Sequence, residues 1–267
     1  MTRIAIVQMR SSEDKQENLI KSIDFVGEAA ANKAEMICFP EFQMAYSPPS
    51  QSARILANIA ETVKGDFVTA LSKAARKYRI GVVASIYEKS NSHRVFDTAL
   101  ALSPAGTISS VYRKLHLYDA LGFKESAKMI RGKAIKDPVR TKAGNVGLLI
   151  CYDLRFPELS RILTVKGAEV LVAPSAWVQG DMKEEHWQTM IKARAIENGS
   201  YVVAPDQVGN IFCGRSMAVD PFGLVLVDMG QREGIETFQI DRSRVQQVRK
   251  SLPLLRNRRT DIYELTY

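Results

Sequence analysis

The stretch VGLLICYDLRFPEL, residues Val146 to Leu159, decides the fold. It begins with a short apolar run that predicts a buried strand, and the run ends abruptly at Cys151. A polar turn from Tyr152 to Arg155 follows, and Pro157 is a residue type favoured at the first position of a helix. The stretch therefore predicts a strand, a turn that exposes a thiol, and then a helix.

The cysteine on this turn has two interpretations. The partial positive charge at the start of the following helix would favour a thiolate, which is the nucleophilic form of the side chain. Alternatively, Cys151 is one more small buried hydrophobic residue, as most free cysteines are. The local sequence leaves both interpretations open.

Apolar strands alternate with amphipathic helices on both sides of this unit. Strands are predicted at residues 3–8, 35–40, 80–87, 96–102, 107–112, 169–173, 201–204, 213–219, 224–228 and 234–240. Helices are predicted over residues 14–34, around residues 67–78 and 187–195, and after residue 240. Several strands are nearly continuous apolar runs, which indicates sheets covered by helices. Because no repeat or linker interrupts the pattern, we expect a single α/β domain over residues 1–267.

The composition is that of an ordinary globular protein. The chain has 267 residues, of which 46% are hydrophobic and 25% charged. No apolar run is long enough to span a membrane, and the N-terminus lacks the pattern of a signal peptide. The three cysteines are odd in number and far apart, which argues against a disulfide framework. We therefore expect a cytoplasmic protein without a membrane partner.

The net charge of +8 does not indicate nucleic-acid binding. Basic residues are scattered, and the densest cluster, at residues 256–259, has no repeating aromatic partners of the kind a single-strand groove uses. We interpret the charge as a solvated surface.

Three reactive side chains stand just past apolar strands, where open α/β sheets place their ligands: Glu41, Lys114 and Cys151. Nucleophilic catalysis needs a nucleophile, a base and a group that stabilises negative charge. Each residue alone has a structural explanation, as a turn cap, a solvated lysine or a core thiol. Their recurrence after three buried runs favours the catalytic interpretation.

Other chemistries lack sequence support. There is no G-x-S-x-G elbow, no zinc motif, no Walker A motif and no G-x-G-x-x-G. A cysteine–histidine pair would need His93, His116 or His186, and none has the sequence signature of a cysteine protease. We expect no metal and no cofactor.

Several motifs, in order along the chain, resemble those of the nitrilase (carbon–nitrogen hydrolase) superfamily. The matching stretches are FPEF with Glu41, YRKLHLYD with Lys114, ICYDLRFPEL with Cys151, APSAW at 173–177, HW at 186–187 and ARAIEN at 193–198. GRSMAVDPFG and LPLLRNRRTDIY further resemble the branch that contains omega-amidase and deaminated-glutathione amidase. The resemblance covers essentially the whole chain.

The resemblance implies a four-layer α-β-β-α sandwich and a catalytic triad. In that triad Glu41 is the general base, Lys114 the electrostatic stabiliser and Cys151 the nucleophile. The segment FKES matches the motif of a second glutamate and nominates Glu125. A lysine close to two carboxylates should remain charged, because opposite charges favour the ammonium form.

The remaining candidate site residues surround this triad. The backbone N–H of Tyr152 would help to hold the oxyanion. Trp177 and Tyr46 are candidates to line the pocket. Arg155 is a candidate substrate contact, although its expected main role is an ion pair with Glu158 that holds the turn.

The expected function is hydrolysis of a small linear amide, such as an α-keto acid amide, through a thioester that releases ammonia and a carboxylic acid. Nitrilase or N-carbamoyl amino acid hydrolase activity on the same triad are alternatives. A catalytically silent partner-binding protein is a further alternative, against which the intact triad argues.

The resemblance also implies a homodimer or higher homo-oligomer, and the tail at about 252–267 is expected to pack on a partner subunit.

Overall fold

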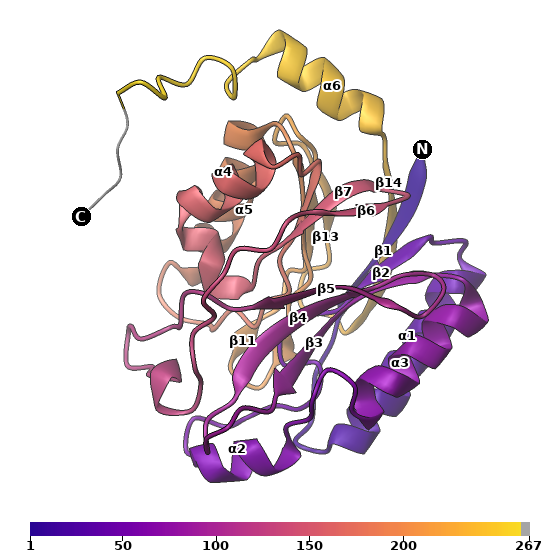
Figure 1. The fold of residues 1–267 in the computed structure, drawn as a ribbon, viewed down its shortest axis with the longest axis vertical. Coiled ribbons are helices and arrows are strands. Elements are labelled where there is room, and N and C mark those ends of the chain that lie inside the picture. Colours follow the sequence, from indigo (N-terminus) through magenta and orange to yellow (C-terminus); the bar gives the residue numbers. More distant parts are fainter. Residues whose placement is uncertain (263–267) are drawn as a thin grey trace.

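The computed structural model describes residues 1–262 and contains two six-stranded sheets that face each other (Figure 1). The first sheet has the order β14 (Gly234–Ile240), β1 (Thr2–Gln8), β2 (Met36–Cys38), β3 (Gly81–Glu88), β4 (Phe96–Leu102) and β5 (Ile108–Arg113). The second has the order β13 (Val225–Asp228), β12 (Met217–Val219), β9 (Tyr201–Ala204), β8 (Val170–Val172), β7 (Gly144–Leu148) and β6 (Val139–Thr141).

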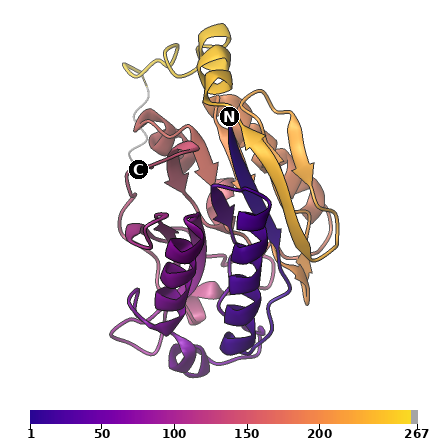
Figure 2. The same cartoon turned by 90° about the vertical axis from the view of Figure 1, so that its right-hand side faces the viewer.

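Helices cover the outer faces of both sheets. Figures 1 and 2 show α1 (Lys15–Ala31) and α3 (Asp66–Tyr78) side by side on the first sheet. On the opposite side of the molecule, α4 (Pro157–Val165) and α5 (Lys183–Asn198) pack against the second sheet. The layers therefore follow the predicted α-β-β-α order.

The alternation of side chains in β1 explains why two cores form. Ile4 and Ile6 point between the two sheets, where they join the larger buried cluster. Ala5 and Val7 point the other way and pack with the apolar faces of α1 and α3. Because successive strand residues face opposite sides, a continuous apolar strand can serve both layers.

Strand direction brings the predicted reactive residues to one end of the sandwich. In the first sheet β2 is parallel to β3, and β5 is also parallel to β3, because two antiparallel pairings separate them. Glu41 and Lys114 therefore follow strand ends at the same edge. In the second sheet β7, β8 and β9 are parallel, and Cys151 follows the end of β7.

The structure differs from the sequence predictions in several places. The strand predicted at residues 213–219 is divided, because Gly214 and Arg215 have φ of 71° and 60°, a left-handed conformation that interrupts a strand. Its first part, β11 (Phe212–Cys213), pairs with β10 (Val208–Gly209) as a separate ribbon. The short helix α2 (Ala53–Ile59) and the edge strand β6 were not predicted.

Beyond α6 (Arg242–Ser251) the chain leaves the sandwich. Residues 252–262 are half-buried or exposed, and Figure 1 shows them running away from the layers. Residues 263–267, the end of the tail expected on a partner subunit, lie outside the described residues. Within residues 1–262, no helix combines the length and the apolar character that crossing a bilayer requires.

Candidate active site

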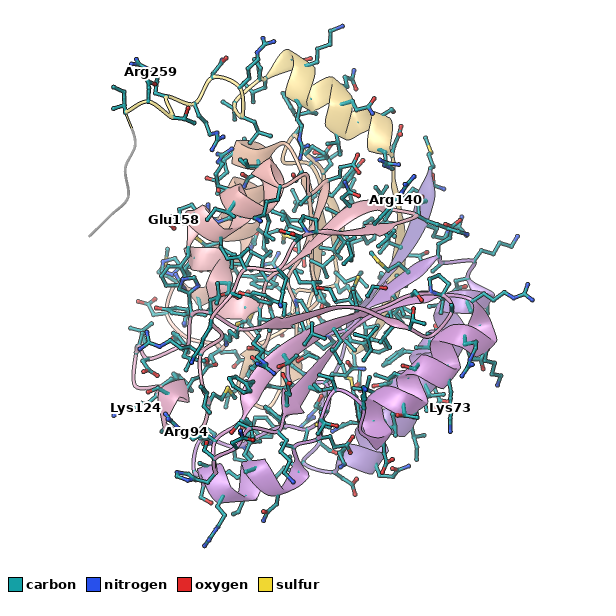
Figure 3. The ribbon with its side chains drawn as sticks, in the orientation of Figure 1. Lys73, Arg94, Lys124, Arg140, Glu158 and Arg259 are labelled. Carbon is teal, nitrogen blue, oxygen red and sulfur yellow. The ribbon has the colours of Figure 1, made fainter. Side chains whose placement is uncertain are left out.

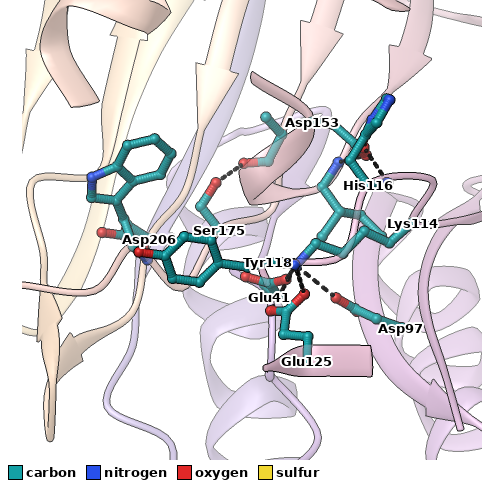
Figure 4. A network of polar contacts seen from close by, with 12 residues as sticks. Glu41, Asp97, Lys114, His116, Tyr118, Glu125, Asp153, Ser175 and Asp206 are labelled. Carbon is teal, nitrogen blue, oxygen red and sulfur yellow. Dashed lines mark hydrogen bonds and ion pairs between the residues drawn. The ribbon is translucent and has the colours of Figure 1, made fainter. Parts of the chain in front are cut away.

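A buried lysine stands at the centre of the site (Figure 4). Lys114 Nζ donates hydrogen bonds to Glu41 Oε1 at 2.7 Å and to both carboxylate oxygens of Glu125 at 2.9 Å. A third carboxyl, that of Asp97 in β4, lies 3.7 Å from the same nitrogen. Lys114, Glu41 and Asp97 are at most 1% exposed. The ends of β2 and β5, β4 and the segment after β5 thus place one cation among three acids.

The thiol of Cys151 lies on a strained turn above this cluster. The chain passes from β7 into a 3-10 helix, η2 (Cys151–Arg155), and Cys151 itself has φ of 42°. This conformation costs a non-glycine residue about 1–3 kcal/mol and persists only where the surroundings hold it. The Cys151 N–H donates to the Pro174 carbonyl at 2.9 Å, which fixes the start of the turn.

Asp153 ties the cysteine turn to the lysine strand. Its Oδ2 accepts hydrogen bonds from the Tyr112 hydroxyl at 2.7 Å and from the Ile150 N–H at 2.9 Å. Its Oδ1 accepts from the His116 N–H at 3.1 Å and lies 2.7 Å from His116 Nδ1. Tyr112 and His116 flank Lys114 in the sequence. One fully buried carboxylate therefore fixes the position of the turn relative to the lysine across the two sheets.

The electrostatics favour a neutral thiol and a charged lysine at rest. Burial, and then the neighbouring Glu41 carboxylate, raise the pKa of Cys151 well above its ordinary value. Of the two interpretations that the sequence left open, a resting thiolate is therefore the disfavoured one, because burial raises the pKa of the thiol. Burial alone would lower the pKa of Lys114, but Glu125 and Glu41 raise it well above its ordinary value. The expected ammonium is thus retained.

The surroundings of the third acid, Asp97, favour its protonated form. Burial, followed by the charge of Glu41, raises the pKa of Asp97 well above its ordinary value. Within residues 1–262 no donor reaches either oxygen of the Asp97 carboxyl, which faces that of Glu41. A neutral Asp97 can donate its proton to Glu41, whereas a charged one would be repelled by it. Burial also raises the pKa of Glu125, although Lys114 opposes that shift.

We expect Asp97→Asn to make the protein more stable at pH 7 and less sensitive to rising pH. The folded-state pKa of Asp97 is raised above its ordinary 3.8, so the folded wild type binds more protons than the unfolded chain. Its free energy of unfolding therefore falls as pH rises from about 4 toward the raised pKa, by up to about 1.4 kcal/mol per pH unit. Asparagine has no such proton to lose.

Urea unfolding of both proteins at pH 5 and pH 7.5 measures this difference. The stability gained by Asp97→Asn should grow between the two pH values. The same dependence of stability on pH in both proteins would contradict a protonated Asp97.

A cavity of about 450 Å³ opens onto Cys151. Its wall includes Tyr152, Trp177, Arg155 and Glu125 from the predicted set, while Glu41 and Lys114 are buried beneath it. Tyr46 does not line the cavity, whereas Phe212 does. The ring of Tyr46 packs edge-on against that of Phe212, with the ring centroids 5.8 Å apart. The other wall residues are mainly aromatic and aliphatic, which is typical of small-molecule sites.

Arg155 does not form the ion pair with Glu158 that we expected. Within the described part of the chain its guanidinium has no acidic partner, and it lies 4.6 Å over the Trp177 ring and 3.4 Å from His186 Nδ1. Glu158 is exposed on the first turn of α4. The turn is held by Asp153 instead, which leaves Arg155 on the cavity wall.

Three further residues build this site and were not predicted from the sequence: Asp97, Asp153 and Lys183. Asp97 resembles any polar residue at the start of a strand, and Asp153 any turn residue. The carboxylate of Asp153 contacts Tyr112, which lies 41 residues away, so no local signal reveals it. Lys183 lines the cavity but lies in a segment, VQGDMKEE, with no periodic pattern. No group of three or more metal-ligating side chains was found in residues 1–262.

Comparison with known proteins agrees with the resemblance that the sequence motifs indicated. The family model described as carbon–nitrogen hydrolase matches residues 3–250. A deaminated glutathione amidase of Escherichia coli O157:H7 is 36% identical over 234 residues, which is 88% of this chain and 88% of that protein. The match agrees with the branch that the motifs indicated.

Two solved structures show the same fold. Nit3 of Saccharomyces cerevisiae, a member of branch 10 of the nitrilase superfamily, is 28% identical with a TM-score of 0.87 over 97% of this chain and 96% of that chain. A mutant of the amidase from Nesterenkonia sp. AN1 is 25% identical with a TM-score of 0.78 over 95% of this chain and 98% of that chain. In that structure acrylamide has added to the active site cysteine.

Proposed function

Because the chain belongs to the carbon–nitrogen hydrolase family, we propose that its amidase reaction takes place at the site formed by Cys151, Glu41 and Lys114. The observation that carries this proposal is the buried Lys114 ammonium, held between the Glu41 and Glu125 carboxylates below the Cys151 turn. A thiol, a base and a fixed cation are the three parts that acyl transfer requires.

Because the Cys151 thiol is neutral at rest, the first step is its deprotonation. Glu41 takes the proton from Cys151 Sγ, and the thiolate attacks the amide carbonyl carbon. The Lys114 ammonium and the Tyr152 N–H, which lies in the first turn of η2 and has no partner within that helix, stabilise the oxyanion. Glu41 then returns its proton to the leaving nitrogen, which departs as ammonia and leaves a thioester on Cys151.

In the second half of the reaction, water hydrolyses the thioester. Glu41 takes a proton from a water molecule, and the resulting hydroxide attacks the thioester carbonyl. Glu125 positions this water, because its carboxylate is fixed by Lys114 and by the Tyr118 N–H at 2.7 Å. Collapse of the second tetrahedral intermediate breaks the carbon–sulfur bond and releases the carboxylic acid. The departing thiolate takes the proton held by Glu41, which regenerates the thiol and the carboxylate.

The substrate in this proposal is a small linear amide of an α-keto acid. The deaminated glutathione amidase relative supports that class. The cavity wall adds physical support, because it carries Lys124, Lys128, Arg155 and Lys183, whereas Glu125, its acid, is already paired with Lys114. This excess of positive charge on the cavity wall favours an anionic substrate.

Ammonia release from matched panels of amides, nitriles and N-carbamoyl amino acids tests the proposal. We expect turnover of the amides, and after rapid acid quenching an acyl mass on the peptide that contains Cys151. Turnover of nitriles or carbamoyl compounds alone would reject the amide assignment. An acyl mass on any other peptide would reject the nucleophile.

We also propose that the protein is a cytoplasmic homodimer built from one domain per chain. Three buried free cysteines support a reducing compartment. The exposed segment 252–262, which leaves the sandwich, supports packing of the tail on a partner subunit. Light scattering at micromolar concentration tests this state: the full chain should have twice the monomer mass, and a monomeric mass would reject it.

A further inference from the structure

The cavity contains a buried ammonium group without an acidic partner. Lys183 is 6% exposed and lies on the wall that also includes Cys151. Its Nζ donates to the Tyr118 hydroxyl at 2.6 Å and lies 4.7 Å and 5.7 Å from the ring centres of Tyr118 and Trp177. Within residues 1–262 it forms no ion pair. Burial of a lysine is costly unless an anion compensates it, so this position is prepared for an anion.

The other cations of the wall differ from Lys183. Lys128 already donates to the Pro48 carbonyl at 2.6 Å and to the Ser47 hydroxyl at 3.2 Å. Lys124 is exposed beside η1 (Glu125–Ala127), at the periphery of the molecule (Figure 3). Arg155 is half-buried and stacks on Trp177. Lys183 is thus the deeply buried one of these four.

The backbone holds Lys183 in a fixed place. Its N–H donates to the Gly180 carbonyl at 3.1 Å, and its carbonyl accepts from Trp177 Nε1 at 2.8 Å. The preceding residue, Met182, has φ of 54°, so the chain turns sharply into α5 at this point. The hydrogen bond to the Tyr118 hydroxyl and the two nearby rings restrain its side chain as well, so little freedom is lost when a ligand binds, which favours affinity.

We propose that Lys183 and the hydroxyl of Tyr118 together bind a carboxylate of the substrate and so select anionic amides. This inference rests on the proposed function and assigns its specificity to two named side chains. The ammonium has N–H donors beyond the one used by Tyr118, and the Tyr118 oxygen, which accepts from Lys183, still has its own proton to donate. A carboxylate between them would receive two hydrogen bonds, one of them charge-assisted.

Tyr118 also connects this position to the reacting groups. Its backbone N–H donates to Glu125 Oε2 at 2.7 Å, whereas its hydroxyl contacts Lys183. Tyr118→Phe therefore removes the second donor to the carboxylate while it keeps the backbone hydrogen bond to Glu125. The two variants, Lys183→Met and Tyr118→Phe, remove the proposed donors one at a time.

The test compares succinamate with butyramide, two amides of similar length of which only the first carries a carboxylate. We expect Lys183→Met to lower the ratio of kcat/KM for succinamate to that for butyramide by about 100-fold, mainly through KM. Tyr118→Phe should lower it by about 10-fold. Lys73→Met, which removes an exposed lysine of α3 (Figure 3), controls for net charge and should leave the ratio within threefold.

Binding without turnover gives an independent readout. In a Cys151→Ala background, calorimetry should detect succinate binding that Lys183→Met weakens by a similar factor. An unchanged ratio and unchanged succinate binding in Lys183→Met would overturn the inference. An equal loss of the ratio in Lys124→Met would also overturn it, because selection would then come from the overall positive charge of the cavity wall. Failure of the proposed function can be distinguished from failure of this inference, because in the first case the wild-type protein would hydrolyse neither amide.

Discussion

Replacing Cys151 with alanine should lower kcat/KM for amide hydrolysis by about 10⁵-fold, to the background of the uncatalysed reaction and the binding pocket. Without sulfur there is no atom to accept the acyl group, and Glu41 has no thiol to deprotonate. The fold itself should persist, because alanine fills the same position and removes a side chain that is 8% exposed. Steady-state ammonia release, with circular dichroism to check folding, measures the effect.

Cys213→Ala provides the matched control. Cys213 is also a buried cysteine, but its Sγ lies 3.4 Å from Asp206 Oδ2, and it is not among the residues that line the cavity. Burial, followed by the charge of Asp206, raises its pKa, which disfavours the thiolate there. This variant should keep activity within about threefold. Native ammonia release by Cys151→Ala would show that the thioester route is wrong.

Replacing Lys114 with methionine should affect both activity and stability. Removing a charge-stabilising donor typically costs about 3–4 kcal/mol in the barrier, so kcat should fall by at least 10²- to 10³-fold. The change also leaves Glu41 and Glu125 buried without their shared cation. Breaking a buried ion pair on one side costs about 3–5 kcal/mol of folding free energy. Urea unfolding and ammonia release on the same samples measure the two effects.

A double variant separates the two roles of Lys114. Lys114→Met combined with Glu125→Gln removes one of the two orphaned carboxylates, so it should recover part of the lost free energy of unfolding. It should recover no activity, because the cation next to the oxyanion is still missing. Recovery of activity together with stability would mean that Lys114 serves only the fold.

Much of the fold could be predicted because the deciding signals are local. The apolar runs and their turns placed the strands within one or two residues, as at residues 96–102, where β4 is Phe96–Leu102. Pro157 marked the start of α4. The division of residues 213–219 could not be predicted, because Arg215 adopts φ of 60° to donate its N–H to the Gly230 carbonyl. That contact exists only after β12 and β13 pair.

The chemistry was less accessible because it depends on burial. Motifs nominated Glu41, Lys114, Cys151 and Glu125, and their roles stay predictions that the variants above test. The ionisation of Cys151 stayed open in the sequence, since a helix start is visible there whereas the burial of the thiol is not. Asp97 was missed for the same reason: its raised pKa reflects burial and the charge of Glu41, which follows β2.

The division of the site between two sheets has a consequence for synthesis of the chain. The first 133 residues supply Glu41, Lys114 and Glu125 but no nucleophile, and β1 still lacks its neighbour β14, which ends at Ile240. Until β14 is made, one edge of β1 has no partner, although its other edge can pair with β2. Activity should appear only after residue 240 has left the ribosome exit tunnel, so products that end before Cys151 or before β14 should be inert.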